Sequence, residues 1–192
     1  MKGRESGMPD EETWESFFNP RCVLERLRLN RTPGDVGEFG CGYGTFTLPA
    51  AHLATGTVHA LDIEPEMVAA THQRAEAEGL RNVSATVRDF VADGTGRPDA
   101  SIGAALLFNI LHIEAPVALM RAARRALVPG GIAGIIHWRS DIPTPRGPSF
   151  DIRPSPVQCQ SWGESAGLEL VRFESLDCCR WHWGLVMRRP VE

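Results

Sequence analysis

The chain has 192 residues, of which 43% are hydrophobic and 23% are charged, and its formal net charge is −4. A chain of this length fits one α/β domain that buries a sizeable core. The small acidic excess supplies no general basic field, so a nucleic acid is disfavoured as a partner. The longest nearly apolar stretch, residues 102–113, is too short to span a bilayer, and we expect no membrane partner.

The first residues differ in character from the rest of the chain. Residues 1–12 are charged and have no apolar core, so we expect a flexible N-terminal tail rather than a signal peptide or an anchor. A single domain is then expected over residues 13–192. Apolar residues at helical spacing predict helix over residues 10–30, with a break at Asn19–Pro20. Residues 13–30 are candidates for lid helices.

From residue 35 onward, strand and helix patterns alternate. This alternation predicts a Rossmann-like, doubly wound α/β fold with a mostly parallel sheet and right-handed crossovers. The last two strands are separated by only a few residues, which predicts an antiparallel hairpin at the edge of the sheet. Strands are expected at residues 35–39, 57–61, 82–88, 102–109, 132–138, 168–175 and 180–188, and helices at residues 45–53, 65–78, 115–127 and 157–166.

The five cysteines are odd in number and irregular in spacing, and no C-x-x-C pair occurs among them. Neither a disulfide framework nor a zinc site is indicated, so we expect no metal and a reducing, cytoplasmic location. Cys178 and Cys179 are adjacent, and two neighbouring Cα atoms lie about 3.8 Å apart, at or below the usual disulfide range. We therefore expect two free thiols there. The cysteines are Cys22, Cys41, Cys159, Cys178 and Cys179.

The most informative segment is Glu38-Phe39-Gly40-Cys41-Gly42-Tyr43-Gly44, with Asp62 at the end of the next expected strand. A loop that leaves a parallel strand for a helix lies where open α/β sheets bind ligands, and its glycines allow close approach of the backbone. An acid at the position of Asp62 can accept both hydrogen bonds of a ribose diol. The segment therefore predicts a site for a cofactor that carries a nucleoside.

Two details separate this segment from a dinucleotide fingerprint. The fingerprint needs a third small residue three positions after its second glycine, where this chain has Thr45. Glu38, just before the glycines, would also repel a pyrophosphate, whereas it suits a ligand with an ammonium group. An NAD-linked oxidoreductase is thus a disfavoured alternative.

These residues resemble motif I of the class I S-adenosylmethionine-dependent methyltransferases, and the resemblance extends over about residues 35–138. It implies a small, single-domain member of bacterial type with a seven-stranded sheet whose last strand is antiparallel. It also implies S-adenosylmethionine as the cofactor and methyl transfer to a small-molecule acceptor by in-line displacement. The cofactor-binding residues that it implies are Glu38, Gly40, Gly42 and Gly44 in the loop, Asp62 and Ile63 after the second strand, Asp89 and Phe90 after the third, and Asn109 at the end of the fourth.

Less is implied about the acceptor side. His112 and His137 follow the fourth and fifth strands and are candidates for a general base, with a purely structural role as the alternative for each. The segment from Asn109 to His112 lacks an Asn-Pro-Pro-aromatic motif, which disfavours exocyclic amines of nucleobases as acceptors. The proline-rich loop 141–156 is the best candidate for acceptor selection.

Other functions remain open at this point. One is a non-catalytic module that binds S-adenosylmethionine or a partner, since a fold does not by itself establish catalysis. A remote one is methylation of a thiophilic metalloid, which requires Cys178 and Cys179 to lie near the transferred methyl group. The shared motifs hold the cofactor, so they identify neither the acceptor nor the oligomeric state.

Overall fold

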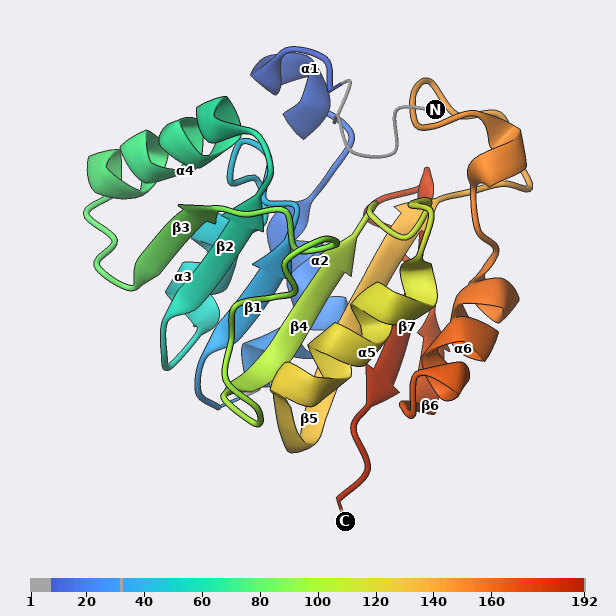
Figure 1. The fold of residues 1–192 in the computed structure, drawn as a ribbon. Helices are drawn as coiled ribbons and strands as arrows, with labels where there is room; N and C mark the ends of the chain where they lie inside the picture. Colours follow the sequence, from blue (N-terminus) through green and yellow to red (C-terminus); the bar gives the residue numbers. More distant parts are fainter. Residues whose placement is uncertain (1–7, 32, 192) are drawn as a thin grey trace.

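The computed structural model describes residues 8–31 and 33–191. Their seven strands form one sheet in the order β3-β2-β1-β4-β5-β7-β6 (Figure 1). Neighbours among the first five strands are parallel, whereas β7 is antiparallel to both β5 and β6. The expected α/β fold with an antiparallel C-terminal hairpin is confirmed. The strands are β1 Val36–Phe39, β2 Val58–Asp62, β3 Val83–Val87, β4 Ile102–Phe108, β5 Leu127–Trp138, β6 Glu169–Glu174 and β7 His182–Arg188.

Helices cover both faces of this sheet. Figure 1 shows α5 and α6 in front of the sheet and α2 and α3 behind it. Within the described part of the chain, no helix is long and apolar enough to cross a bilayer. The helices are α1 Glu11–Glu15, α2 Pro20–Arg26, α3 Thr47–Leu53, α4 Pro65–Ala77, α5 Pro116–Ala126 and α6 Pro156–Ser165, with 3₁₀ turns η1 Leu29–Arg31 and η2 Phe150–Ile152.

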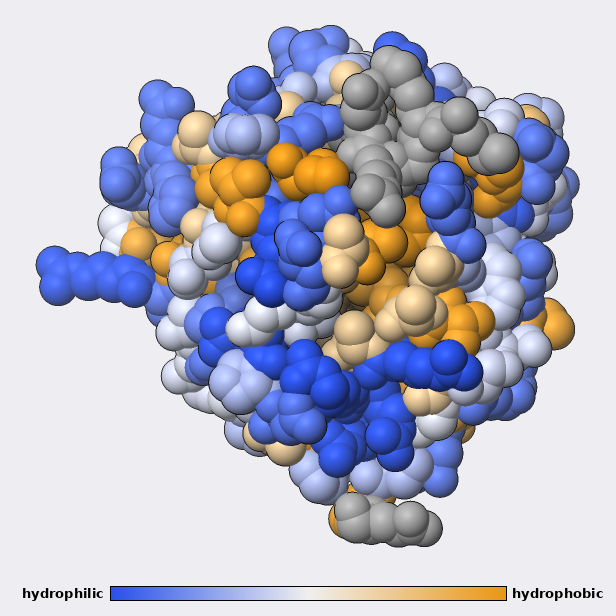
Figure 2. All heavy atoms as spheres, in the orientation of Figure 1, coloured by the Kyte–Doolittle hydropathy of each residue, from blue (hydrophilic) through white to orange (hydrophobic). Residues whose placement is uncertain are grey.

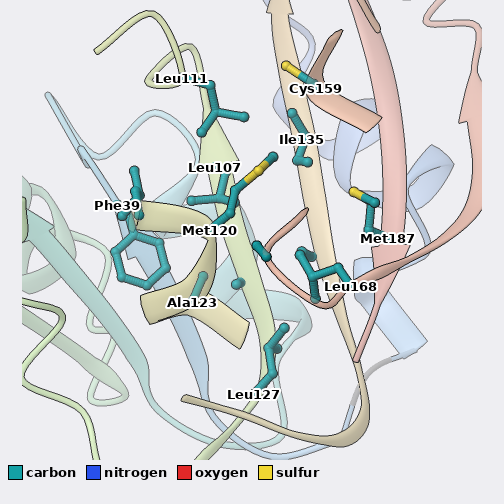
Figure 3. Packing of buried hydrophobic residues seen from close by; sticks show 14 of the residues in the cluster. Phe39, Leu107, Leu111, Met120, Ala123, Leu127, Ile135, Cys159, Leu168 and Met187 are labelled. Atoms are coloured by element: carbon teal, nitrogen blue, oxygen red, sulfur yellow. The ribbon is translucent and has the colours of Figure 1, made fainter. Parts of the chain in front are cut away.

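Strand β4 is buried along its whole length. It contributes side chains to two hydrophobic clusters, one on each face of the sheet. Successive side chains of a strand point to opposite faces, so Leu107 packs in the α5–α6 cluster and Leu106 in the α2–α3 cluster. Figure 3 shows Leu107 beside Met120 of α5 and near Ile135 of β5. Complete burial of each such side chain contributes about 1.5–3 kcal/mol.

The N-terminal helical region is divided more finely than expected. The break at Asn19–Pro20 is present, and the Asn19 side chain accepts a hydrogen bond from the amide of Cys22 as an N-cap of α2. Helix α1 begins at Glu11, two residues before the expected start of the domain at residue 13. Most of the expected tail, residues 1–7, lies outside the described residues.

Strand β5 begins five residues earlier than expected. Pro129-Gly130-Gly131 lies between the helix expected at residues 115–127 and the strand expected at residues 132–138. Instead Leu127 already pairs with Ile102, and the register shifts before Ala104. Gly130 and Gly131 also exchange backbone hydrogen bonds with Arg189, just after β7, so this segment continues the sheet instead of forming a free turn.

The expectation about Cys178 is wrong. Cys22 of α2 and Cys178, in the turn between β6 and β7, form a disulfide across a sequence separation of 156 residues. The fold alone brings these two residues together, so their spacing along the chain contains no sign of it. Cys179 is free and buried, as are Cys41 and Cys159. Because Cys22 and Cys178 are paired, the cysteines no longer argue for a reducing compartment.

The disulfide leads to a test of stability. Cys22→Ser should lower the free energy of unfolding by about 2–4 kcal/mol, because the cross-link restricts a very long loop of the unfolded chain. Urea denaturation of the oxidised proteins measures this change, and Cys178→Ser should produce the same loss. The Cys22→Ser/Cys178→Ser double variant should lose no more than either single variant. A wild-type protein whose stability is unaffected by dithiothreitol would contradict the cross-link.

Candidate active site

A cavity of about 480 Å³ lies at the carboxyl ends of the parallel strands, below α1. Figure 2 shows hydrophobic residues gathered in the upper middle of this face, near the end of β4 in Figure 1. The wall of the cavity combines the N-terminal segment, the ends of β1, β2, β3 and β4, and the loop after β5. The residues that line it are Met8, Pro9, Trp14, Gly40, Gly42, Asp62, Ile63, Arg88, Asp89, Phe90, Val91, Phe108, Asn109, Ile110, His112, Ile113, Trp138, Arg146, Gly147, Pro148, Ser149 and Ile152.

The glycine loop is fastened to the end of β2. The amides of Gly40 and Cys41 both donate to the carbonyl of Leu61, at 2.8 and 3.0 Å. Gly40, Gly42 and Gly44 have φ angles of +86°, +53° and +81°, a region in which other L-residues are strained. The sequence therefore needs glycine at all three positions for the loop to take this path.

Only two of these glycines line the cavity. A Cβ on Gly42 would lie 3.0 Å from Cε of Met8, so a side chain there would push into the cavity wall. Gly44 faces away from the cavity and into the protein. A Cβ on Gly44 would lie 2.7 Å from Cδ1 of Leu48 and 3.1 Å from Oγ1 of Thr71. Gly44 therefore allows close packing of the loop on α3 and α4.

Asp62 lines the cavity and also holds the glycine loop. Its carboxylate accepts from the amide of Gly42 at 2.9 Å and from the amide of Glu64 at 3.0 Å. Burial raises its pKa, and these two amide hydrogen bonds oppose the change. A carboxylate has about four acceptor positions, so Asp62 can still accept from a ligand. Ile63 follows it on the same wall.

Glu38 lies beneath the loop and not on the cavity wall. Its side chain is 2% exposed, and Oγ1 of Thr47 donates to its Oε2 at 2.5 Å. Burial raises the pKa of this carboxyl to about 8; the Thr47 hydroxyl opposes the rise, and the nearby Asp62 charge adds to it. Sequence reasoning missed Thr47, because its partner is nine residues away on another element.

Asp89 and Phe90 are both on the wall after β3. Oδ1 of Asp89 accepts from the amides of Val91 at 3.1 Å and Ala92 at 2.9 Å, so this side chain caps the turn that follows. The ring of Phe90 meets the ring of Phe39 edge-on, with centroids 5.8 Å apart. Phe90, which the resemblance places near adenine, is thus held in position by Phe39.

Asn109 ends β4 with a φ of +54° and lines the cavity. Its Nδ2 lies 3.4 Å from Nε2 of His182, whose Nδ1 lies 3.1 Å from Sγ of Cys179. That thiol donates in turn to the carbonyl of Phe17 at 3.2 Å. This chain fixes the amide orientation of Asn109. Oδ1 of Asn109 is buried, with no hydrogen-bond partner among the described residues.

The two candidate histidines are in direct contact but differ in position. His112 lines the cavity, whereas His137 is completely buried behind it. Nδ1 of His112 lies 3.2 Å from Nε2 of His137, and burial lowers the pKa of both rings. Leu111, between Asn109 and His112, is buried in the core and does not face the cavity.

Helix α1 covers one side of the cavity and is held there by charge pairs. Nη1 of Arg74, on α4, lies 2.9 Å from Oε1 of Glu11 and 2.7 Å from Oε1 of Glu15. The same nitrogen donates to the carbonyl of Tyr43 in the glycine loop, at 3.0 Å. The Tyr43 hydroxyl donates to the carbonyl of Pro9, also at 3.0 Å.

Met8 and Pro9 were missed as part of the cavity wall. Met8 and Pro9 fall in the stretch expected to be a tail. Their neighbours are mostly polar or charged, so no apolar pattern indicates that these two residues line a cavity. Trp14 was expected in a possible lid helix. Its ring meets that of Trp138 edge-on, with centroids 6.4 Å apart.

The loop after β5 covers the other side of the cavity and is organised by Arg153. Its guanidinium donates to the carbonyls of Pro148 at 2.7 Å, Arg139 at 3.0 Å and Arg146 at 3.1 Å. It also donates to Oγ1 of Thr144 at 2.6 Å. Sequence reasoning missed Arg153, although it identified the loop itself as a candidate for acceptor selection.

No cysteine is part of the cavity wall. Neither Cys178 nor Cys179 belongs to it, which removes the geometric condition for metalloid methylation. Among residues 8–31 and 33–191, no three side chains of His, Cys, Asp or Glu are grouped so as to hold a metal ion.

Comparison with known proteins identifies the fold and the family. A family model described as a methyltransferase domain matches residues 36–131, half of the chain. Ribosomal protein L11 methyltransferase of Dechloromonas aromatica is 34% identical over 125 residues, which cover 63% of this chain and 39% of that protein. Nocamycin O-methyltransferase of Saccharothrix syringae is 34% identical over 135 residues, which cover 65% of this chain and 45% of that protein. The chain thus spans less than half the length of these relatives.

Solved structures agree on the fold. A S-adenosylmethionine-dependent methyltransferase from Aquifex aeolicus superposes with a TM-score of 0.79 at 21% identity, covering 93% of both chains. The [4+2]-cyclase SpnF superposes with a TM-score of 0.76 at 19% identity, covering 98% of this chain and 85% of that one. Given the family match and a glycine loop with its two acids at the carboxyl end of the sheet, the chain belongs to the class I S-adenosylmethionine-dependent methyltransferases.

Proposed function

We propose that this protein transfers the methyl group of S-adenosylmethionine to a small-molecule acceptor. The observation that carries the proposal is the single continuous cavity at the carboxyl ends of the parallel strands. Its wall runs from Gly42 and Asp62, where a nucleoside cofactor fits, past Asn109 to the loop after β5. Cofactor and acceptor therefore share one cavity.

The chemistry of the residues fits this cofactor. S-adenosylmethionine, when bound, supplies an electrophilic methyl group on a positively charged sulfur, next to an ammonium group and a carboxylate. Two acids, Asp62 and Asp89, line one end of the cavity and favour a cationic ligand, and Glu38 lies buried beneath them. The bare backbone of Gly42 permits close approach, and Oδ1 of Asn109 is a buried acceptor without a partner in the described residues.

Each residue then has a definite task. Asp62 accepts hydrogen bonds from the ribose hydroxyls, while Ile63 and Phe90 pack on the adenine. Asn109 orients the reacting end of the ligand, since its amide is fixed from behind by His182. Met8, Trp14 and Trp138 exclude water from the reaction. Holding two reactants in line in this way accounts for a large part of the barrier reduction in a displacement.

A small acceptor is favoured over a nucleic acid. A volume of about 480 Å³ must hold both reactants, and pockets of this size suit small ligands. The wall beyond Asn109 is largely apolar, with Ile110, Ile113 and Trp138 as its main residues. The net charge of −4 also gives no electrostatic footprint for a polyanion, although one relative is a 23S rRNA methyltransferase.

Two alternatives make different predictions. A non-catalytic module would bind the same cofactor without transferring its methyl group. The [4+2]-cyclase SpnF has a similar fold, so a fold of this kind can host other chemistry. An NAD-linked oxidoreductase would bind NAD(H) instead. The family match disfavours it, and so does Thr45 at the position where a dinucleotide fingerprint needs a small residue.

Calorimetric titration with S-adenosylmethionine, S-adenosylhomocysteine and NAD(H) tests the cofactor assignment. We expect the wild-type protein to bind the first two, and Asp62→Ala to bind them at least tenfold more weakly, a loss of about 1.4 kcal/mol. Asp93→Ala, which removes an exposed carboxylate outside the cavity wall, is the matched control and should bind like the wild type. A folded protein that binds only NAD(H), or none of the three, would overturn the proposal.

The buried carboxyl of Glu38 predicts a pH dependence of stability. Its pKa rises from 4.5 in the unfolded chain to about 8 in the folded protein. Between these values the folded protein binds more protons than the unfolded chain, so the free energy of unfolding falls as the pH rises. The stabilisation is fully present below pH 4.5 and is lost as the pH passes 8. Glu38→Gln should remove this contribution.

Urea denaturation at pH 5, 6.5 and 8 measures the effect as the difference between variant and wild type. Glu38→Gln should become more stable relative to the wild type as the pH rises, while Glu76→Gln, an exposed residue of α4, should track the wild type. Equal pH slopes for wild type and Glu38→Gln would show that Glu38 is already ionised in the folded protein.

A further inference from the structure

The pair formed by His112 and His137 carries an inference that rests on the proposed function and extends it to the acceptor. We propose that His112 is the general base of the reaction, that His137 is the positioning residue that sets its tautomer, and that the acceptor group is a phenolic or enolic hydroxyl. The supporting contacts start with the backbone carbonyl of Trp138, which lies next to the ring of His137.

The carbonyl of Trp138 fixes the tautomer of His137. Nδ1 of His137 lies 3.4 Å from this oxygen, which can only accept, so Nδ1 bears the ring hydrogen. The ring is completely buried and its pKa is lowered well below the usual value, chiefly by desolvation, so it is neutral. Its Nε2 is therefore a bare acceptor. The reverse tautomer would place two buried acceptors against each other, at a cost in stability.

The tautomer of His112 follows from that of His137. Nδ1 of His112 lies 3.2 Å from the bare Nε2 of His137, so it donates and bears the hydrogen. In a neutral imidazole this leaves Nε2 of His112 with a lone pair. No hydrogen-bond partner for this nitrogen occurs among the described residues, and His112 forms part of the cavity wall. A basic atom is thus presented to the ligand space.

His112 is neutral near pH 7 because it is largely buried. Burial lowers its pKa, and neutral His137 stands directly behind it. Arg146 and Arg88, from the loops after β5 and β3, and Asp89 share the cavity wall with it. The buried guanidinium of Arg153 and neutral His182 of β7 lie farther back, near His137.

A base of this kind selects the acceptor. A neutral amine attacks without first losing a proton, and a thiol is already partly ionised at pH 7 and strongly nucleophilic, so both depend on His112 less than a hydroxyl does. A hydroxyl must lose its proton, and a weakly basic imidazole is best matched to an acidic O–H such as that of a phenol or an enol. The apolar side chains of Ile110, Ile113 and Trp138 suit a ring or a conjugated skeleton.

The proposed step moves one proton and one methyl group. The O–H bond of the acceptor breaks, and its proton goes to Nε2 of His112. The acceptor oxygen forms a bond to the transferred carbon while the carbon–sulfur bond breaks, and both electrons of that bond stay on the neutral thioether sulfur. Nδ1–H of the resulting His112 imidazolium still donates to His137, so the ring keeps its orientation. The proton then passes from Nε2 to solvent.

The tautomer itself can be tested on the protein without any ligand. Two-dimensional ¹⁵N–¹H NMR of histidine-labelled protein should show His112 protonated at Nδ1 and bare at Nε2. His137→Leu removes the acceptor and should shift His112 toward a mixture of tautomers, whereas His137→Gln, which keeps an oxygen acceptor near the position of Nε2, should restore the wild-type signals. A His112 protonated at Nε2 in the wild type would overturn the proposal.

Kinetics then test the acceptor class with a panel of substituted phenols, alkylamines and thiols. With weakly acidic phenols, His112→Gln should lower kcat by about 100-fold or more, with unchanged S-adenosylmethionine affinity by calorimetry. With 4-nitrophenol at pH 8, which is already largely ionised, the loss should be small. His72→Gln, on α4 outside the cavity wall, is the matched control.

The outcomes separate this inference from the proposed function. A protein that binds no S-adenosylmethionine contradicts the proposed function and with it a base for methyl transfer. A protein that binds it and methylates amines or thiols, or no phenol of the panel, overturns the acceptor class while the cofactor assignment stands. Equal losses of kcat with both kinds of phenol would mean that His112 has a structural role only.

Discussion

The attachment of the glycine loop to the end of β2 is the constraint on which the site depends. One carbonyl, that of Leu61, accepts the amides of both Gly40 and Cys41, and the next residue, Asp62, accepts the amide of Gly42. Two strand ends are thereby fixed relative to each other before any ligand arrives. A loop so placed needs three residues with positive φ, which explains the alternating glycines.

The two covers of the cavity are each held by one arginine, in different ways. Arg74 holds α1 through partly exposed carboxylates, an arrangement that salt screens and that contributes little to stability. Arg153 holds the loop after β5 through neutral oxygens in a buried setting, where each hydrogen bond is worth more. Opening on the α1 side is therefore the easier of the two, and the side formed by the loop after β5 is the more rigid.

Local patterns predicted the parts of the molecule that depend on local physics. The apolar run of β4 and the glycines at alternate positions each gave a correct element, since period and backbone freedom are properties of neighbouring residues. The contacts that complete the site join residues far apart in sequence. Thr47 against Glu38, His137 behind His112 and Cys22 bonded to Cys178 are products of the fold, so no spacing rule could reveal them. Met8 was missed for a different reason. Its neighbours in the sequence are polar and charged, so nothing in the local pattern indicates that it lines the cavity.

The bond between Cys22 and Cys178 also changes the topology of the molecule. It closes a covalent ring that contains the strands from β1 to β6, and with them every strand end that borders the cavity, while α1 and β7 lie on the two arms outside the ring. A single protease cut in the exposed loop between β5 and α6 would therefore open the ring without releasing either piece. The oxidised protein can be nicked beside the cavity and still remain one covalent molecule, whereas the reduced protein would depend on non-covalent packing alone to stay together.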